Sequence, residues 1–200
     1  MENKRGFFVV VTLDRLDELR KFLISLSKFH KDYPVSIYLA KDRIDAFRAK
    51  TKMAFLTPFP LTVFMDVDIY VNGKLDYLFE IAAKYKVGVI RHPHSGDLNT
   101  GVIAFPKCIM QKFSKKWAEI FDERLKDGTL QFKEYDQGVF NTLAPEMPIE
   151  ELSTDYNATF HDITPEEEIK RWKDIKVFHF LHSWPTDKEK FKSYKLYMEL

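Results

Sequence analysis

The sequence predicts an α/β fold: a single domain with a mixed, mainly parallel central sheet flanked by helices. Apolar runs rich in β-branched and aromatic residues alternate with stretches of helical periodicity through the first half of the chain. This strand, helix, strand, helix, strand order is typical of a doubly wound sheet, whose ligands lie outside the carboxyl ends of the strands. The 200 residues, 45% of them hydrophobic and 15% aromatic, suffice to bury one full core.

Three strands and two helices are expected in the first part of the chain. Residues 6–13 form a continuously apolar run, as expected of a strand that is buried on both faces. Residues 14–30 carry Leu and Phe at helical spacing and therefore predict a helix. Strands at 35–40 and 61–65 enclose a second helix at 41–56.

The second half is less regular, and its segments are separated by turn and cap signals. Gly128 ends a long amphipathic helix, while Thr164, Pro165 and Glu167 form the start signature of another helix. The expected helices lie at 75–85, 107–128, 135–144 and 164–174, and the expected strands at 86–90, 100–106 and 175–180.

Composition narrows the class of protein. Lys plus Arg is 31 and Asp plus Glu is 30, a balance that gives no broad basic field for binding nucleic acid. Cys108 is the only cysteine, which excludes an intramolecular disulfide and a cysteine-based zinc site. No apolar run is long enough for a transmembrane segment or a signal peptide. We therefore expect a soluble cytoplasmic protein.

Five motifs occur in an order that resembles a known family. They are VTLD at 11–14, VFMDVDIYVNGKLDYLFE at 63–80, NTGVIAFPK at 99–107, EYDQGVFNT at 134–142 and, as a partial match, VFHFLHSWP at 177–185. Together they resemble the nucleotide-sugar-dependent glycosyltransferases of the GT-A fold, and within them the glycogenin-like retaining enzymes. The resemblance implies one Rossmann-like domain, with a nucleotide-binding part at 1–72 and an acceptor-side part at 73–200.

The resemblance implies that Asp66 and Asp68 hold a divalent ion on the diphosphate of the donor. Charge accumulates on the diphosphate as it leaves, and a Lewis acid stabilises that charge. Oxygen ligands suit Mn²⁺ or Mg²⁺. Alternate residues of an extended segment share a side, so the two carboxylates can converge while Val67 packs into the core. The alternative is that both aspartates only cap the following loop.

His179 matches the histidine that completes the metal site in this family, the alternative being a hydrogen-bonded core residue. The family continues with a glycine and then Lys-Pro-Trp, whose lysine contacts the diphosphate. In this chain His182 stands at the glycine position and no lysine precedes Trp184. We therefore expect His182 to contribute to donor binding, with Lys188 and Lys190 as the nearest substitutes for the lysine.

Other donor-binding residues follow from position in the family's motifs. Thr12 and Leu13 match residues that contact the base and begin the nucleotide pocket, although a Thr there can also be a helix cap. Lys50 lies near the family's donor-facing basic residue. Arg48 and Lys52 are equally basic neighbours, and a solvated helix face is the alternative for all of them.

The reacting sugar is expected to meet two further groups of residues. Asn99, Thr100 and Gly101 match a motif usually written Asn-Ser-Gly, whose polar groups approach the donor sugar; the alternative is a turn before a strand. Asp136 and Gln137 match the acidic residue and the amide beneath that sugar. Asp136 is thus the candidate to stabilise positive charge at the anomeric carbon or to act as a transient nucleophile, and a helix N-cap is its alternative.

The acceptor side gives weaker signals. His92, His94 and Asp97 could hold a second metal ion, but a polar loop at the rim of the cleft explains them better. Residues 157–172 contain no tyrosine, so self-glycosylation at the place used by glycogenin-like proteins is not expected.

These observations predict a metal-dependent glycosyltransferase that uses a nucleotide-diphosphate hexose, with a UDP-sugar favoured and the acceptor unknown. Because the lysine before Trp184 is missing, a nucleotide-sugar-binding protein without transfer activity is the alternative. A haloacid-dehalogenase-like phosphatase is a remote alternative, because its D-x-D motif normally lies on the first strand and here it follows the third.

Overall fold

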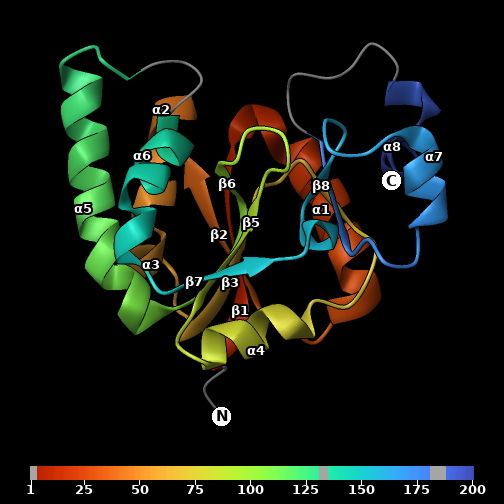
Figure 1. Ribbon diagram of the computed structural model, residues 1–200, viewed down its shortest axis with the longest axis horizontal. Coiled ribbons are helices and arrows are strands. Elements are labelled where there is room, and N and C mark those ends of the chain that lie inside the picture. Colours follow the sequence, from red (N-terminus) through yellow and green to blue (C-terminus); the bar gives the residue numbers. More distant parts are fainter. Residues whose placement is uncertain (1–3, 131–134, 181–187) are drawn as a thin grey trace.

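A six-stranded mixed sheet forms the centre of the computed structural model, which describes residues 4–130, 135–180 and 188–200 (Figure 1). The strand order is β2-β1-β3-β6-β5-β7. Strand β1 is parallel to β2 and β3, and β5 is parallel to β7, while β6 runs antiparallel to both β3 and β5. The expected mixed, mainly parallel sheet is therefore confirmed. The strands are β1 Arg5–Thr12, β2 Val35–Ala40, β3 Leu61–Met65, β5 Val87–Arg91, β6 Leu98–Pro106 and β7 Ile149–Leu152.

Helices cover both faces of this sheet (Figure 1). Helices α1 and α4 pack on one face, and α2, α3, α5 and α6 lie on the other, toward the left of the figure. The helices are α1 Leu16–His30, α2 Arg43–Thr51, α3 Met53–Leu56, α4 Asp76–Ala83, α5 Lys107–Lys126, α6 Tyr135–Leu143, α7 Pro165–Lys170 and α8 Lys192–Met198.

Strand β1 is apolar at successive positions because both of its faces are buried under helices. Phe7 belongs to the core that contains Phe22 of α1, whereas its neighbour Phe8 belongs to the core that contains Trp117 of α5. Successive side chains of a strand point to opposite faces, so a strand between two helix layers must be apolar at every position.

A second, three-stranded sheet lies beside the first, in the order β4-β9-β8. Its strands are β4 Ile69–Val71, β8 Ala158–Thr159 and β9 Val177–His179. In the antiparallel pair of β4 and β9, Ile69 lies opposite His179. This register brings the end of β9 next to the residues that precede β4.

The second sheet has its own apolar cluster, to which Tyr197 of α8 contributes, and α7 and α8 lie at the right of Figure 1. Glu168 of α7 is fully buried and accepts hydrogen bonds from the backbone N–H groups of Lys192 (2.7 Å) and Ser193 (2.9 Å). Orphan N–H groups at the start of a helix need acceptors, so this buried carboxylate fixes the start of α8.

The expected elements are present with two kinds of difference. The single helix expected at 41–56 is divided at Lys52 into α2 and α3. Strands β4, β7 and β8 have no counterpart among the expected elements, because each is only 2–4 residues long. Helix α5 ends as expected, two residues before Gly128, which has a φ of 68°. None of the helices in the described ranges combines the length and apolar character that crossing a bilayer requires.

Candidate functional site

A cavity of about 370 Å³ opens at the carboxyl ends of β1 and β3. Its wall is formed by the end of β1, by one side of α2, by the turn between β3 and β4 and by the end of β9. Its polar lining residues include Thr12, Arg15, Lys50, Asp66, Asp68 and His179. The cavity therefore lies at the edge of the sheet where the sequence predicted a ligand.

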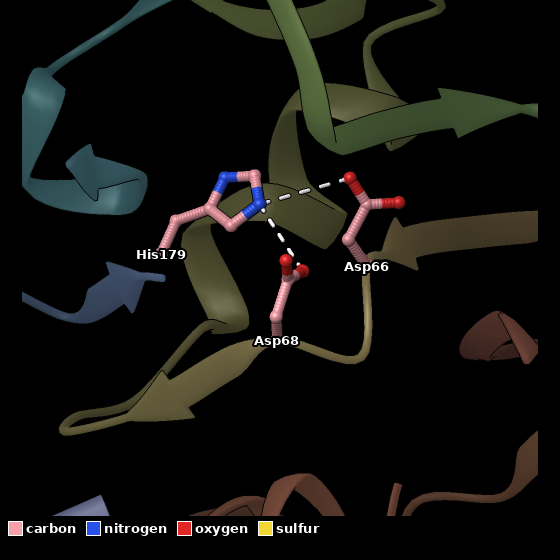
Figure 2. Close-up of side chains that lie close together, drawn as sticks. All are labelled: Asp66, Asp68 and His179. Atoms are coloured by element: carbon pink, nitrogen blue, oxygen red, sulfur yellow. Dashed lines mark ion pairs between the residues drawn. The ribbon is translucent and has the colours of Figure 1, made fainter. Parts of the chain in front are cut away.

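Asp66, Asp68 and His179 converge in this cavity (Figure 2). Nε2 of His179 lies 3.3 Å from Oδ1 of Asp68 and 3.8 Å from Oδ2 of Asp66, and the three side chains offer ligand atoms within 4.8 Å of one another. Val67 is buried between the two aspartates, as predicted. Within the described ranges no other group of His, Cys, Asp or Glu meets the same criterion.

Pairing between distant segments holds this arrangement in place. The backbone N–H of Phe180 donates to the carbonyl of Asp68 (2.7 Å), and the N–H of Asp66 donates to the carbonyl of Gly101 (2.9 Å). Gly101 also makes room for the histidine ring, because a Cβ on it would lie 2.3 Å from Cε1 of His179. The sequence supplies glycine where the ring must sit against the backbone.

The chemistry of this trio fits a divalent ion. Two carboxylates and one imidazole form a mixed oxygen and nitrogen donor set that such ions accept. His179 is 3% exposed, its Nε2 faces both carboxylates, and its Nδ1 has no hydrogen-bond partner in the described part of the chain. A cation held by the two carboxylates would lie within reach of Nε2, the nitrogen that faces them, and would give this buried imidazole a polar partner.

Lys50 contacts both Asp66, a candidate metal ligand, and Asp136, the residue expected beneath the donor sugar. Its Nζ lies 3.2 Å from both carboxylate oxygens of Asp66 and 3.1 Å from Oδ2 of Asp136. Burial alone would lower the pKa of Lys50, but the charges of Asp136 and Asp66 outweigh it and raise this pKa. The ammonium group therefore stays charged inside the protein.

The surroundings of Asp66 disfavour its ionised form. Burial in the cavity raises the pKa of this carboxyl, the charges of Lys50 and His179 lower it, those of Asp68 and Asp136 raise it, and the net shift is upward. A cation between the two carboxylates would favour the ionised form of both.

Asp136 and Gln137 lie in the first turn of α6 and meet Thr100 of β6. The Thr100 hydroxyl donates to Oδ2 of Asp136 (3.0 Å), and its backbone N–H donates to Oε1 of Gln137 (3.2 Å). Nε1 of Trp117 donates to the backbone carbonyl of Asp136 (2.8 Å). Asp136 is 4% exposed, so these contacts together with Lys50 hold its carboxylate firmly.

Asn99 is held inside the protein. Its Oδ1 accepts hydrogen bonds from the N–H of Gly101 (2.7 Å) and from Nδ2 of Asn157 (2.7 Å), and its Nδ2 lies 2.6 Å from Nε2 of His92. Nδ1 of His92 pairs with Asp162 at 3.1 Å. These polar bonds, and not a second group of metal ligands in the described ranges, account for His92.

The remaining expected residues divide between the cavity and its surroundings. Thr12 lines the cavity, whereas Leu13 is 64% exposed and does not belong to the lining. Arg48 points to Asp122 on α5, with Nε 2.7 Å from its carboxylate, so Lys50 is the cation of α2 that meets Asp66. Lys52 is absent from the lining, and Nζ of Lys188 lies 5.3 Å from the Tyr194 ring.

His182 lies outside the described residues. Lys190 belongs to a short 3-10 helix, Lys188–Lys190, and does not line the cavity. Two basic residues of the cavity, Arg15 and Arg43, were missed in the sequence. Arg15 directly follows the VTLD motif at 11–14, so its position after the first strand was the available signal.

Comparisons with known proteins place this geometry in a fold. No model of a known protein family matches the chain, and no curated protein does. The solved structures that resemble it include the glycosyltransferase GlyE of Streptococcus pneumoniae TIGR4, with a TM-score of 0.71 and 15% identity. They also include the galactosyltransferase LgtC in complex with donor and acceptor sugar analogues, with a TM-score of 0.68 and 12% identity.

The chain has the GT-A fold. The match to LgtC covers 98% of this chain and 96% of LgtC, so the GT-A fold extends over nearly the whole sequence, as predicted. The match to GlyE covers 98% of this chain and 60% of GlyE, so the chain spans only part of the length of that protein. This GT-A arrangement gives no support to the phosphatase alternative.

Proposed function

We propose that the chain is a metal-dependent glycosyltransferase. It would transfer a hexose, with retention, from a nucleoside-diphosphate sugar to an acceptor, and a UDP-sugar is the favoured donor. The observation that carries the proposal is the convergence of Asp66, Asp68 and His179 in a cavity at the carboxyl ends of the strands, within a fold that solved glycosyltransferases share.

The first step is to bind and orient the donor. Asp66, Asp68 and His179 would hold Mn²⁺ or Mg²⁺, which acts as a Lewis acid on the leaving diphosphate. Thr12 and Leu13 would meet the base at the end of β1. In this assignment residues 1–72 supply the nucleotide-binding part and residues 73–200 the acceptor-side part.

The second step is to stabilise charge at the sugar. Both Thr100 Oγ1 and Lys50 Nζ contact Oδ2 of Asp136. Oδ1 is thus the oxygen that we assign to the anomeric carbon, where it would stabilise positive charge or act as a transient nucleophile. Lys50 keeps Asp136 and Asp66 at a fixed separation, and Gln137 would lie beneath the same sugar.

Four further residues complete the proposed donor site. Asn99 and Gly101 brace the strand beside His179, and Thr100 orients Asp136. We propose that this strand lies along the donor sugar and that His182 contacts the phosphates.

A nucleotide-sugar-binding protein without transfer activity is the second candidate. The observation that favours it is the partial match of the C-terminal motif, which has no lysine before Trp184 and Pro185. Such a protein would bind the donor through the same metal site and leave the sugar intact.

Donor hydrolysis separates the two candidates. We would incubate the protein with UDP-, GDP-, CMP- and TDP-sugars in Mn²⁺, in Mg²⁺ and in EDTA, and measure free sugar. A transferase should hydrolyse one donor slowly with metal and stop in EDTA. Metal-dependent binding of a donor without any release of sugar would favour the binding protein, and hydrolysis that continues in EDTA would contradict the metal assignment.

A further inference from the structure

We propose that Arg15 is a further donor-binding residue, whose guanidinium contacts the diphosphate of the nucleotide. The inference rests on the proposed function, because it concerns the same cavity. Arg15 ends the short 3-10 helix Leu13–Arg15 directly after β1, and its side chain lines the cavity. No sequence motif pointed to it.

The position of the guanidinium is fixed by an acidic neighbour. Nε and Nη2 of Arg15 lie 2.7 Å and 3.1 Å from the two carboxylate oxygens of Glu18. Its side chain is 23% exposed and that of Glu18 is 32% exposed, so the pair is partly shielded from water. This ion pair, with its one hydrogen bond from Nη2 to Oε1 of Glu18, orders a long side chain before any ligand arrives.

The same guanidinium lies beside the candidate metal site. Nη2 of Arg15 is 3.8 Å from Oδ2 of Asp68, whereas Oδ1 of Asp68 lies 3.3 Å from Nε2 of His179. Asp68 thus stands between the imidazole and the arginine. The 3.8 Å separation is too long for a hydrogen bond, so the guanidinium adjoins this carboxylate without being bonded to it there.

The charges of the cavity explain why an anion would need this arginine. Lys50 is neutralised by Asp66 and Asp136, and a divalent ion would be neutralised by the carboxylates of Asp66 and Asp68. A diphosphate would bring further negative charge, and Arg15, itself paired with Glu18, would meet it as a hydrogen-bond donor and not as an uncompensated charge. A guanidinium suits this role because its planar array of N–H donors matches phosphate oxygens.

Arg43 is the other arginine of the cavity, and its contacts place it differently. Its guanidinium carbon lies 5.4 Å from the centre of the Phe47 ring and 5.5 Å from that of Tyr135. These two rings are stacked on each other at 4.5 Å. Arg43 therefore extends the contact between α2 and α6, and Arg15 is the arginine that adjoins a candidate metal ligand.

The test compares UDP with UMP by isothermal titration of the whole chain in excess Mg²⁺. Arg15→Gln should weaken UDP binding by roughly 10-fold or more, the effect of a lost hydrogen bond between charged groups, and should weaken UMP binding less. Arg15→Lys keeps the charge but loses the planar pair of N–H donors, so its UDP affinity should lie between those of the wild type and Arg15→Gln. Arg20→Gln removes an arginine of α1 whose side chain is 53% exposed and should change neither affinity.

Three results would overturn the proposal. One is an unchanged ratio of UDP to UMP affinity in Arg15→Gln; if that variant does not fold, the same result in Arg15→Lys decides. Another is a loss of Mn²⁺ affinity in nucleotide-free Arg15→Gln that equals its loss of UDP affinity, measured by electron paramagnetic resonance. Arg15 would then act through Asp68. The third is a wild-type protein that binds none of UDP, GDP, TDP and CMP with metal. This result would contradict the proposed function itself, and with it the role of Arg15.

Discussion

Replacing Gly101 with alanine should damage the candidate metal site without touching any of its ligands. The added Cβ would lie 2.3 Å from Cε1 and 2.6 Å from Nδ1 of His179, and 2.9 Å from Oδ1 of Asn99. Ordinary contact begins at 3.4 Å, so the ring must shift by about 1 Å. His179 is 3% exposed, so this shift must disturb the core or the position of Nε2.

Two quantities follow from this clash. Overpacking of a core typically costs about 1–3 kcal/mol, so the free energy of unfolding should fall by that amount. Displacement of a metal ligand or of its support should weaken metal binding by roughly 10-fold or more. Thermal denaturation in EDTA measures the first quantity, and Mn²⁺ titration followed by electron paramagnetic resonance measures the second.

Gly73→Ala is the matched control. Its added Cβ would meet Cδ of Lys176 at 2.6 Å, which is part of a flexible side chain that can move aside. Metal affinity should therefore stay at the wild-type value. A folded Gly101→Ala protein that binds Mn²⁺ as tightly as the wild type would contradict this prediction, because His179 could not then be a ligand in the position described.

The remaining predictions address the chemistry and the fold. Asp66→Asn should abolish metal-dependent nucleotide binding, whereas Asp136→Asn should keep that binding and lose turnover; loss of binding in folded Asp136→Asn would place Asp136 with the nucleotide. The hydroxyl of Tyr33 donates a hydrogen bond to Asp76 (2.7 Å) and lowers the pKa of that carboxyl in the folded protein. This hydrogen bond therefore stabilises the protein at a pH above the unfolded pKa of about 3.9, and the stabilisation is lost as the pH falls through the lower pKa of the folded state. Tyr33→Phe should therefore cost about 1 kcal/mol in urea unfolding at pH 7 and almost nothing near pH 2, and an equal cost at both would contradict the assignment. The hydroxyl of Tyr197 is buried without a hydrogen-bond partner in the described ranges, so Tyr197→Phe should leave the melting temperature unchanged or raise it, and a clear decrease would reveal a missing partner.

Local patterns in the sequence were enough for the layers of the fold and for half of the candidate site. The continuous apolar character of β1 predicted burial on both faces, and the spacing of Asp66 and Asp68 predicted that they would converge. Both follow from periodicity within one short segment. The capping signature at Thr164 likewise predicted the start of α7, where both hydrogen bonds of the capping box are present.

Contacts between distant segments could not be predicted in this way. His179 reaches the aspartates because β9 pairs with β4, and β4 is too short to give a pattern of its own. Only the family resemblance indicated this histidine. Arg15 was missed for a related reason. Its proposed role depends on its closeness to Asp68 in space and on its ion pair with Glu18, and no periodicity in the sequence reveals either.

The central claim is that Asp66, Asp68 and His179 bind a nucleoside diphosphate through a divalent ion. Ligand binding stabilises the folded state by mass action, by about 2.7 kcal/mol at a ligand concentration 100 times Kd. The most direct test is the melting temperature with UDP, GDP, CDP and TDP, each in Mn²⁺, in Mg²⁺ and in EDTA. We expect at least one of these nucleotides to raise the melting temperature by several degrees with metal and hardly at all in EDTA, whereas the same increase with and without metal would contradict the metal-bridged site.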